Sequence, residues 1–233
     1  MTLFIALDDT DMPGTRGTGR LARAVADAIA ACHPVAGVTR HQLLLDPAIP
    51  YTSHNSCAVV HVGAGPGELD GVLDLARGVM RDGFIEGSDP GLAGVVAGAV
   101  SPAVIAFGQD AKRCVLTRER AVRTARNAGV FLEPLGGTGD GVIGALAGIG
   151  LAATGCDGRY LALGRVRDLV GDCTVEAVLD AGVDLVLTPD GRPVRSGRIA
   201  GQDRRAPKPC PFQGRAVLFV EEADGVYLPV KRD

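Results

Sequence analysis

The chain opens with a short apolar run that ends directly in three aspartates, and this feature constrains the fold more than any other. Residues 3–7 have the pattern of a buried strand, and Asp8 marks its end. Apolar residues then recur at helical spacing from Leu21 to Cys32, so the sequence predicts a helix that begins near Thr18. This part of the chain is therefore expected to form a strand, an acidic loop that contains glycines, and a helix.

The carboxylates of Asp8, Asp9 and Asp11 lie close together in the sequence, where like charges repel one another unless a cation neutralises them. Mg²⁺ prefers oxygen ligands and is commonly shared with nucleotide phosphates, so one or two of these carboxylates can bind it while another orients water or a nucleophile. We therefore predict that the three aspartates are the metal-binding and catalytic residues of a Mg²⁺–ATP site. The alternative is an acidic turn that caps the following helix, although three carboxylates exceed what a cap needs.

Two glycine-rich segments are candidates for contacts with ATP phosphates, because glycine lets backbone N–H groups approach an anion at the start of a helix. The first segment follows the aspartates, and its candidate residues are Gly14, Gly17, Thr18 and Gly19. The second precedes an expected helix over residues 142–150, and its candidates are Gly137, Thr138, Gly139 and Gly141. On its residues alone the second segment also fits a tight loop without a ligand, and Asp140 within it would either bind metal or repel phosphate. The sequence lacks the lysine-containing pattern of a Walker loop.

Composition and charge argue against several classes of protein. The formal net charge of -3 gives no global attraction to nucleic acid or to a membrane, and six Phe, three Tyr and no Trp provide few surfaces for base stacking. The six cysteines are scattered without a CxxC pair, which indicates ordinary thiols, and only His54 among the histidines is a candidate site residue. The N-terminus lacks the pattern of a signal peptide, and no apolar run reaches the ~20 residues of a membrane span. We therefore expect a cytoplasmic protein with no membrane partner.

Strand and helix signals alternate along the rest of the chain and predict an α/β (α+β) fold of mixed sheets covered by helices, with two lobes around the nucleotide as an option. Strands are expected over residues 39–46, over 57–62 and near 95, and helices over 69–80, from 102 and over 117–127. We expect residues 1–190 to form the ATP-binding region. Residues 191–233 are expected to form a basic linker, whose Lys and Arg lie between 192 and 215, and then a small β extension with a hairpin over 216–230.

Four segments in this order resemble one known family: Ile5–Asp11, Asp46–Tyr51 with Asn55 shortly after, Ser88–Gly91 and Gly139–Gly150. Together they are similar to the kinase-like and ferredoxin-like portion of the archaeal tRNA agmatinylcytidine synthetase family. Members attach agmatine to an anticodon cytidine and use ATP to activate its C2 oxygen as a phosphorylated intermediate. The resemblance covers roughly residues 3–155.

The resemblance implies roles for particular residues. Asp8, Asp9 and Asp11 match the acids that bind metal and ATP, Asn55 falls at the nucleotide site, and Thr18 lies where the family has a pair of threonines that includes its phosphorylated residue. Gly19 replaces the second threonine of that pair, and residues 50–55 lack the Lys and Arg of the family's corresponding stretch. The C-terminal part of the chain does not resemble the OB-fold and zinc-ribbon modules that hold tRNA in the family.

Three functional hypotheses follow from the sequence. The leading one is an ATP- and Mg²⁺-dependent kinase or ligase-like enzyme that acts on a small molecule such as an amine. The alternative is a tRNA-modifying enzyme like the agmatinylcytidine synthetases, in which the basic segment over 192–215 or a partner subunit contacts RNA. The third is a nucleotide-binding protein without catalysis. Nucleic acid is the less favoured partner, because the chain as a whole is acidic.

Overall fold

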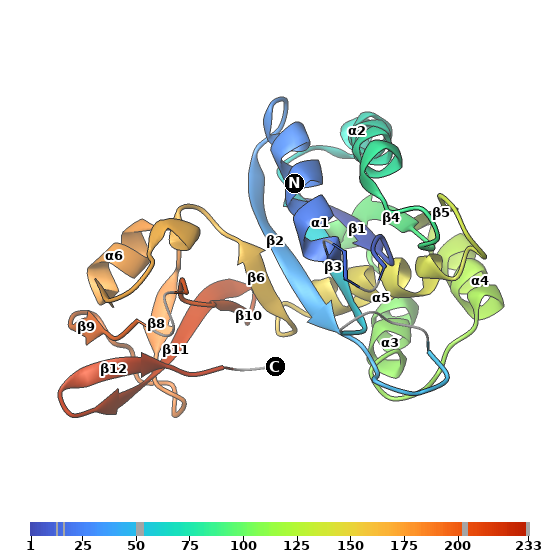
Figure 1. The fold of residues 1–233 in the computed structure, drawn as a ribbon. Helices are drawn as coiled ribbons and strands as arrows, with labels where there is room; N and C mark the ends of the chain where they lie inside the picture. The colour runs from blue at the N-terminus through green and yellow to red at the C-terminus, as the bar shows by residue number, and fades with distance from the viewer. Residues whose placement is uncertain (13, 16, 50–53, 202–204, 232–233) are drawn as a thin grey trace. The chain divides into compact units, whose positions relative to one another are not determined.

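The computed structural model describes residues 1–12, 14–15, 17–49, 54–201 and 205–231, and it divides into two compact units, Met1–Thr154 and Gly155–Asp233 (Figure 1). Each unit contains a β-sheet and helices, which confirms the α/β (α+β) class expected from the sequence. Residues 50–53, within the stretch that resembles the synthetase family, and Arg204 of the basic segment lie outside the described residues. No described helix is long and apolar enough to cross a membrane.

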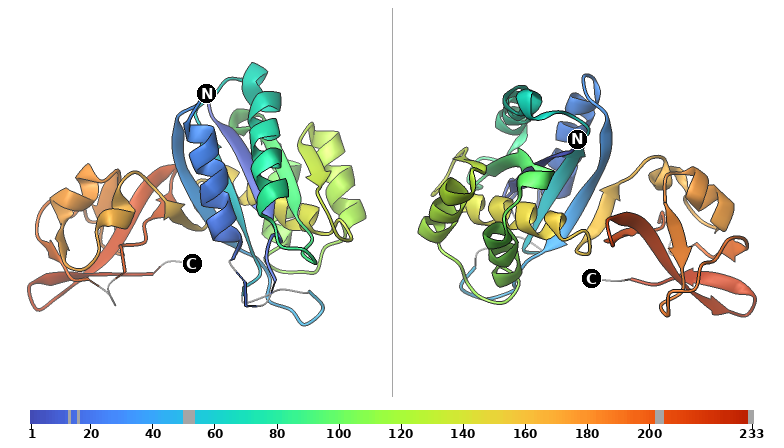
Figure 2. Two further views of the ribbon diagram at one scale, coloured as in Figure 1. Left: turned by 45° about the horizontal axis from the view of Figure 1, so that its top comes forward. Right: turned by 180° about the vertical axis from the view of Figure 1, so that it is seen from behind.

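The first unit is built on an antiparallel sheet with the strand order β5-β4-β1-β3-β2. Helices α1 and α2 cover one face, and α3, α4 and α5 lie on the other (Figure 2). The strands are β1 (Leu3–Asp8), β2 (Val35–Gln42), β3 (Ser56–Val62), β4 (Gly91–Val96) and β5 (Phe131–Pro134). The helices are α1 (Thr18–Ala30), α2 (Leu69–Gly83), α3 (Pro102–Asp110), α4 (Arg118–Ala128) and α5 (Gly141–Ala153), with short 3-10 turns at Pro66–Glu68 and Ala97–Ala99.

Strand β1 lies at the centre of this sheet, which explains why its sequence is apolar at every position before Asp8. Phe4 and Ala6 face the cluster that contains α5, and the alternate residues Leu3, Ile5 and Leu7 are fully buried as well. A strand covered on both faces has no solvent side on which to place polar residues. The apolar run therefore indicates a central strand, and Asp8 lies at the C-terminal end of that strand.

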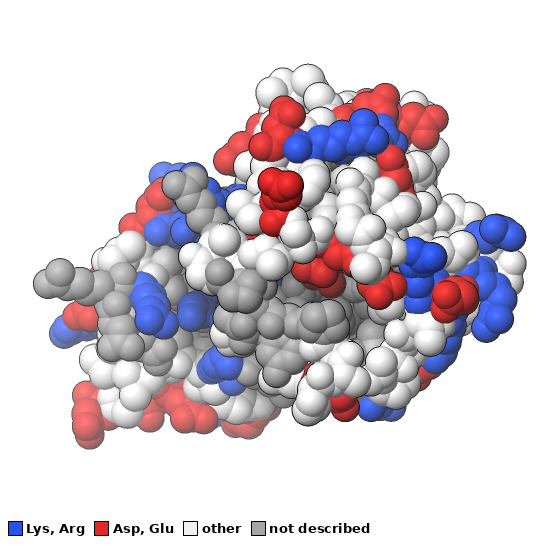
Figure 3. All heavy atoms as spheres, turned by 45° about the vertical axis from the view of Figure 1, so that its right-hand side comes forward, with Lys and Arg blue, Asp and Glu red and all other residues white. Residues whose placement is uncertain are grey.

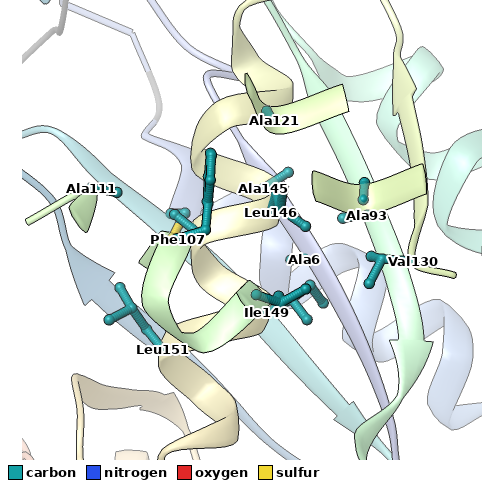
Figure 4. Packing of buried hydrophobic residues seen from close by; sticks show 14 of the residues in the cluster. Ala6, Ala93, Phe107, Ala111, Ala121, Val130, Ala145, Leu146, Ile149 and Leu151 are labelled. Atoms are coloured by element: carbon teal, nitrogen blue, oxygen red, sulfur yellow. The ribbon is translucent and has the colours of Figure 1, made fainter. Parts of the chain in front are cut away.

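Helix α5 is the buried helix of the first unit, and its glycines allow neighbouring chains to approach its backbone. A Cβ atom on Gly148 would lie 3.0 Å from the Sγ atom of Cys57, and one on Gly150 would lie 2.1 Å from the carbonyl oxygen of Val104. On the same helix, Leu146 and Ile149 pack with Phe107 of α3 (Figure 4). The small residues seen in the sequence thus mark a close contact with β3 and α3.

One local expectation differs from the structure in its bounds. The strand expected over residues 39–46 begins and ends four residues earlier, because Val35 already pairs with Val62 of β3 and a register shift at Gly37 carries the pairing onward. Beyond Gln42 the chain leaves the sheet, and the Asp46 carboxylate accepts a hydrogen bond from the Ala48 amide in a turn. The helices expected near Thr18, over 69–80, from 102 and over 117–127 and the strand over 57–62 are confirmed.

The second unit has its own sheet, in the order β10-β11-β12-β9-β7, with β8 parallel to β11. Its elements are β6 (Arg159–Ala162), a 3-10 turn at Val166–Asp168, β7 (Cys173–Thr174), α6 (Val175–Asp180), β8 (Leu185–Leu187), β9 (Arg198–Ile199), β10 (Cys210–Phe212), β11 (Arg215–Ala223) and β12 (Val226–Pro229). The hairpin expected over 216–230 is present as β11 and β12.

The segment expected to be a basic linker contributes strands to this second sheet. Residues 198–199 form β9 and residues 210–212 form β10, and the core of the unit joins Val175, Val186 and Leu218 in one cluster. The boundary between the two compact units falls at Thr154 and Gly155, whereas the change in composition that set the expected boundary lies near residue 190. Arginines are frequent wherever a segment is exposed to solvent. A short strand with exposed arginines therefore resembles a linker in its composition.

Candidate functional site

A cavity of about 250 Å³ opens in the first unit where β1 ends. Its lining includes four acids, Asp8, Asp9, Asp11 and Asp140, and also Thr18 and Asn55. The remaining wall is largely apolar and comprises Leu43, Ala48, Ile49, Ala111, Val115, Leu116 and Ile143. Red acidic atoms gather near the middle of the face drawn in Figure 3. The described lining residues all belong to Met1–Thr154, so this cavity is a feature of the first unit alone.

Asp8 is held at the end of β1 by two glycines. It pairs with Gly91 of β4, and a Cβ atom on Gly144 of α5 would lie 1.5 Å from an Asp8 carboxylate oxygen. The pKa of Asp8 is raised to about 7, chiefly by burial of the carboxyl group and also by the charges of Asp9 and Asp11, while a hydrogen bond with the Asp9 backbone lowers it. The charged form of Asp8 is therefore disfavoured near neutral pH, as expected for a carboxylate whose charge a bound cation would neutralise.

Asp9 has a left-handed backbone, with a φ of 49°, a conformation that Asp tolerates better than most residues. Its carbonyl oxygen accepts a hydrogen bond of 3.1 Å from the Asp89 amide. Burial and then the charges of Asp89, Asp11 and Asp140 together raise the pKa of the Asp9 carboxyl to about 6, although a hydrogen bond with the Asp89 backbone opposes them. The two acids at the end of β1 thus share one environment, in which each negative charge disfavours the next.

Asp11 has a different role, because it caps helix α1. Its Oδ1 accepts hydrogen bonds from the Thr18 amide at 3.3 Å and from the Thr18 hydroxyl at 2.9 Å. The Thr10 hydroxyl, itself buried, donates to the Thr18 hydroxyl at 3.2 Å. The capping interpretation therefore fits one of the three aspartates, Asp11, which also lines the cavity together with Asp8 and Asp9.

The second glycine-rich segment binds an anion in this structure, but the anion is a side chain. Asp89 accepts hydrogen bonds from the Gly139 amide at 2.7 Å, from the Asp140 amide at 3.0 Å and from the Thr138 hydroxyl. A Cβ atom on Gly141 would lie 1.8 Å from the Asp89 carbonyl oxygen, so this position requires glycine. Of the amides expected to hold phosphate, that of Gly139 is thus engaged by Asp89, a residue that the sequence alone did not mark as part of the site. Its signal was available in the Ser88–Gly91 segment.

The predicted nucleotide-binding residues are distributed unevenly around the cavity. Thr18, Asn55 and Gly141 line it, and so does His54. Among the described lining residues we do not find Gly14, Gly17, Gly19, Gly137, Thr138 or Gly139. Asn55 also has a structural role, since its side-chain amide donates to the Leu44 carbonyl oxygen at 2.7 Å and holds the loop that follows β2.

The donor chemistry of the cavity fits Mg²⁺ better than a bare anion. No Lys or Arg is found among its described lining residues, so a polyphosphate would meet four carboxylates without a cation. No three described His, Cys, Asp or Glu side chains are arranged to hold a metal together. Mg²⁺ is often held by one or two carboxylates and completes its shell with water and phosphate oxygens. Asp8 and Asp9 meet that smaller requirement.

Comparison with known proteins supports the resemblance seen in the sequence. No family model and no curated protein matches the chain. Solved structures do match: apo TiaS, a tRNA agmatidine synthetase, at 25% identity with a TM-score of 0.54, and a tRNA fluorescent labeling enzyme at 26% identity with a TM-score of 0.55. A complex of TiaS with tRNA and ATP, at 24% identity with a TM-score of 0.56, shows the same fold.

These matches cover 64% of this chain but only 35–36% of the matched chains. The chain therefore spans about a third of the length of the larger synthetase structures, and the similarity is to a portion of them.

Proposed function

We propose that this chain is an ATP- and Mg²⁺-dependent enzyme that modifies RNA by joining an amine to it, as the similar synthetase does. The observation that carries the proposal is the cavity at the end of β1, which brings Asp8, Asp9, Asp11 and Thr18 together within the fold shared with TiaS. Each of these residues was a site candidate on sequence grounds. Their functional roles are part of this proposal.

Each part of the cavity has a task in this scheme. Asp8 and Asp9 hold Mg²⁺, which when bound supplies charge neutralisation for the phosphates of ATP. Asp11 fixes the position of the Thr18 hydroxyl on the cavity wall through the hydrogen bond of 2.9 Å. The apolar residues Leu43, Ile49 and Leu116 provide a surface for the adenine ring and exclude water from it. Phosphorylation of Thr18 stays a prediction.

The comparisons favour RNA over a small molecule as the substrate. The similar structures at 25–26% identity are named as enzymes that act on or label tRNA. The leading hypothesis from the sequence, a kinase or ligase for a small molecule, has no such support in its choice of substrate. We therefore place the RNA-modifying alternative first, with the amine as the second substrate.

The test is ATP consumption by the purified chain with RNA alone, with agmatine alone and with both, together with transfer of labelled agmatine into tRNA. We expect consumption to require Mg²⁺ and to rise only when both substrates are present, with label appearing in RNA. Turnover stimulated by an amine without RNA would instead identify a small-molecule enzyme. Nucleotide binding without turnover under every condition would identify the non-catalytic protein.

A matched pair of variants connects this activity to the cavity. Asp9→Asn removes one charge beside the proposed metal, whereas Asp27→Asn makes the same change at an exposed position on α1 that does not line the cavity. We expect Asp9→Asn to weaken Mg²⁺–ATP binding by about 10-fold or more, the effect of losing an interaction of about 1.5–3 kcal/mol. Equal behaviour of the two variants would contradict this placement of the site.

A further inference from the structure

The second unit contains a cavity of about 340 Å³ that none of the features above explains. Its cationic lining residues are Arg159, Arg167, Arg205 and Lys208, and no Asp or Glu appears among the described residues that line it. They come from β6, from the 3-10 turn at Val166–Asp168 and from the segment that leads to β10. Segments far apart in the sequence thus bring several positive charges to one hollow, which we call the basic cavity.

A second hollow of about 100 Å³ adjoins the basic cavity across residues 205–208. Arg205 and Lys208 line both hollows, and Lys231 lines the smaller one. Here too the described lining residues include no acid. The positively charged lining therefore extends from the basic cavity into its smaller neighbour.

This gathering of cations is not a consequence of composition. Residues 155–233 contain twelve Lys and Arg and twelve Asp and Glu, so the unit has no formal net charge. Four of its cations nevertheless line one cavity whose described lining residues include no acid. Like charges assembled in this way favour an anionic occupant.

The walls of the basic cavity are held in place by hydrogen bonds and buried residues. The Tyr160 amide donates to the Pro209 carbonyl oxygen at 2.9 Å, and the Arg167 guanidinium donates to the Leu161 carbonyl oxygen at 3.1 Å. Leu163 and Val166, which also line it, are buried in the core of the unit. A cavity formed in this way loses little conformational entropy when it binds a ligand.

We propose that the basic cavity and its smaller neighbour bind successive phosphates of an RNA strand. Arginine matches phosphate geometry through paired donors, and strand-binding grooves combine cations along the backbone with an aromatic surface for a base. Tyr160 lines the cavity as well, and it also packs against the core of the unit. This inference rests on the proposed function. It adds a surface that contacts the proposed RNA substrate. Within the basic segment expected from the sequence, the inference singles out Arg205 and Lys208, which line the cavity, whereas Arg192 and Arg198 are not among its described lining residues.

The test is the affinity of the full chain for a labelled single-stranded RNA, measured by fluorescence anisotropy over a range of salt concentrations. We expect Arg205→Gln and Lys208→Gln each to weaken binding several-fold and to lower the slope of log K against log salt by about 0.7, the loss of one phosphate contact in a single strand. Arg192→Gln is the matched control in the same unit and should bind as the unaltered chain does. Thermal unfolding of each variant checks that it folds, and Arg205→Lys, which keeps the charge, should retain most of the binding.

Three results would overturn the inference: no RNA binding, cavity variants that bind as tightly as the unaltered chain, or a control that loses as much as they do. A further measurement adds millimolar inorganic phosphate as a competitor. Complete displacement of the RNA by phosphate would assign the cavity to a free phosphate ligand instead. ATP binding by the unaltered chain is measured in parallel. Its absence refutes the proposed function, whereas RNA binding that is indifferent to the cavity substitutions refutes this inference alone.

Discussion

At the scale of single residues, the first unit contains groups whose charged forms are disfavoured by their surroundings. Asp8 and Asp9 have raised pKa values at the end of β1, and His61 has a lowered pKa between β1 and β2. Burial is the first cause in each case. The acids and the histidine therefore affect stability with opposite signs as the pH falls, and variants can separate the two effects.

For Asp8, the folded pKa of about 7 lies above the ordinary value of 3.8, so the fold favours the protonated form. Its contribution to stability is fully present below about pH 4 and is lost as the pH rises through 7. We expect Asp8→Asn, measured in EDTA, to be at least as stable as the unaltered chain above pH 7 and to lose Mg²⁺–ATP binding. A large fall in melting temperature with unchanged nucleotide affinity would contradict the metal-binding role.

His61 shares a hydroxyl with a second histidine. The Thr39 Oγ1 atom lies 2.8 Å from the Nε2 atom of His41 and 2.9 Å from that of His61, and the His61 ring packs edge-on against Phe4. Burial and then the charge of His41 lower the pKa of His61 to about 4. The stability that it contributes is present above pH 6.5 and is lost as the pH falls towards 4.

We therefore expect the urea unfolding midpoint of His61→Phe, which keeps a ring against Phe4, to rise relative to that of the unaltered chain as the pH falls through that interval. An identical pH slope in the variant would show that His61 is not the titrating group.

At the scale of elements, α5 and its preceding loop determine how the site is held. Gly141 and Gly144 bring the start of α5 against β4 and Asp8, and Asp89 ties the loop to the end of β1. The sequence predicted β1, α1 and α5 because strand and helix signals are local. It did not predict Asp89 as a site residue, because its partners lie 50 residues away along the chain and no local pattern reports such a contact.

Gly144→Ala tests the contact between α5 and Asp8. The added methyl group would meet the carboxylate, so we expect a loss of about 1–3 kcal/mol in the free energy of unfolding and weaker Mg²⁺–ATP binding. Gly78→Ala is the control, since nothing lies within 4 Å of its Cβ position on α2 and alanine favours a helix. Unfolding in denaturant measures both variants, and a Gly144→Ala protein as stable as Gly78→Ala would refute the close contact.

Asp89→Asn tests the clamp on the glycine-rich loop. One side-chain oxygen remains where two accepted hydrogen bonds, so we expect faster hydrogen exchange at the amides of Gly139 and Asp140 and a loss of about 1.5–3 kcal/mol in stability. Asp89→Ala should lose more. If ATP phosphates compete with Asp89 for these amides, the alanine variant would instead bind ATP more tightly, which would contradict a purely positioning role.

At the scale of the whole molecule, the two units differ in how far the sequence could describe them. Resemblance and local signals anticipated the first unit, where alternating strands and helices form one sheet with its helical layers. The second unit consists of short strands that pair across long stretches of chain, such as β8 with β11. Pairing of this kind leaves little periodic pattern in the sequence, so only its terminal hairpin was predicted.

Because each unit has its own core, we expect residues 1–154 to fold when expressed alone and to bind Mg²⁺–ATP with the affinity of the full chain. Cooperative thermal unfolding and a nucleotide titration measure this. An unfolded fragment would show that the first unit depends on the second. Affinity that falls strongly in a folded fragment would show that the cavity alone does not account for nucleotide binding.

The glycine contacts of α5 also set limits on how this chain can change over evolutionary time. A methyl group at position 141, 144 or 150 would meet backbone or carboxylate atoms at 1.5–2.1 Å, whereas the Cβ positions of Gly71 and Gly78 on α2 face open space. Mutational drift should therefore be slow along the buried helix and fast along the outer one. Among proteins descended from a common ancestor, the sequence of α5 should therefore stay similar after most of the surface has diverged.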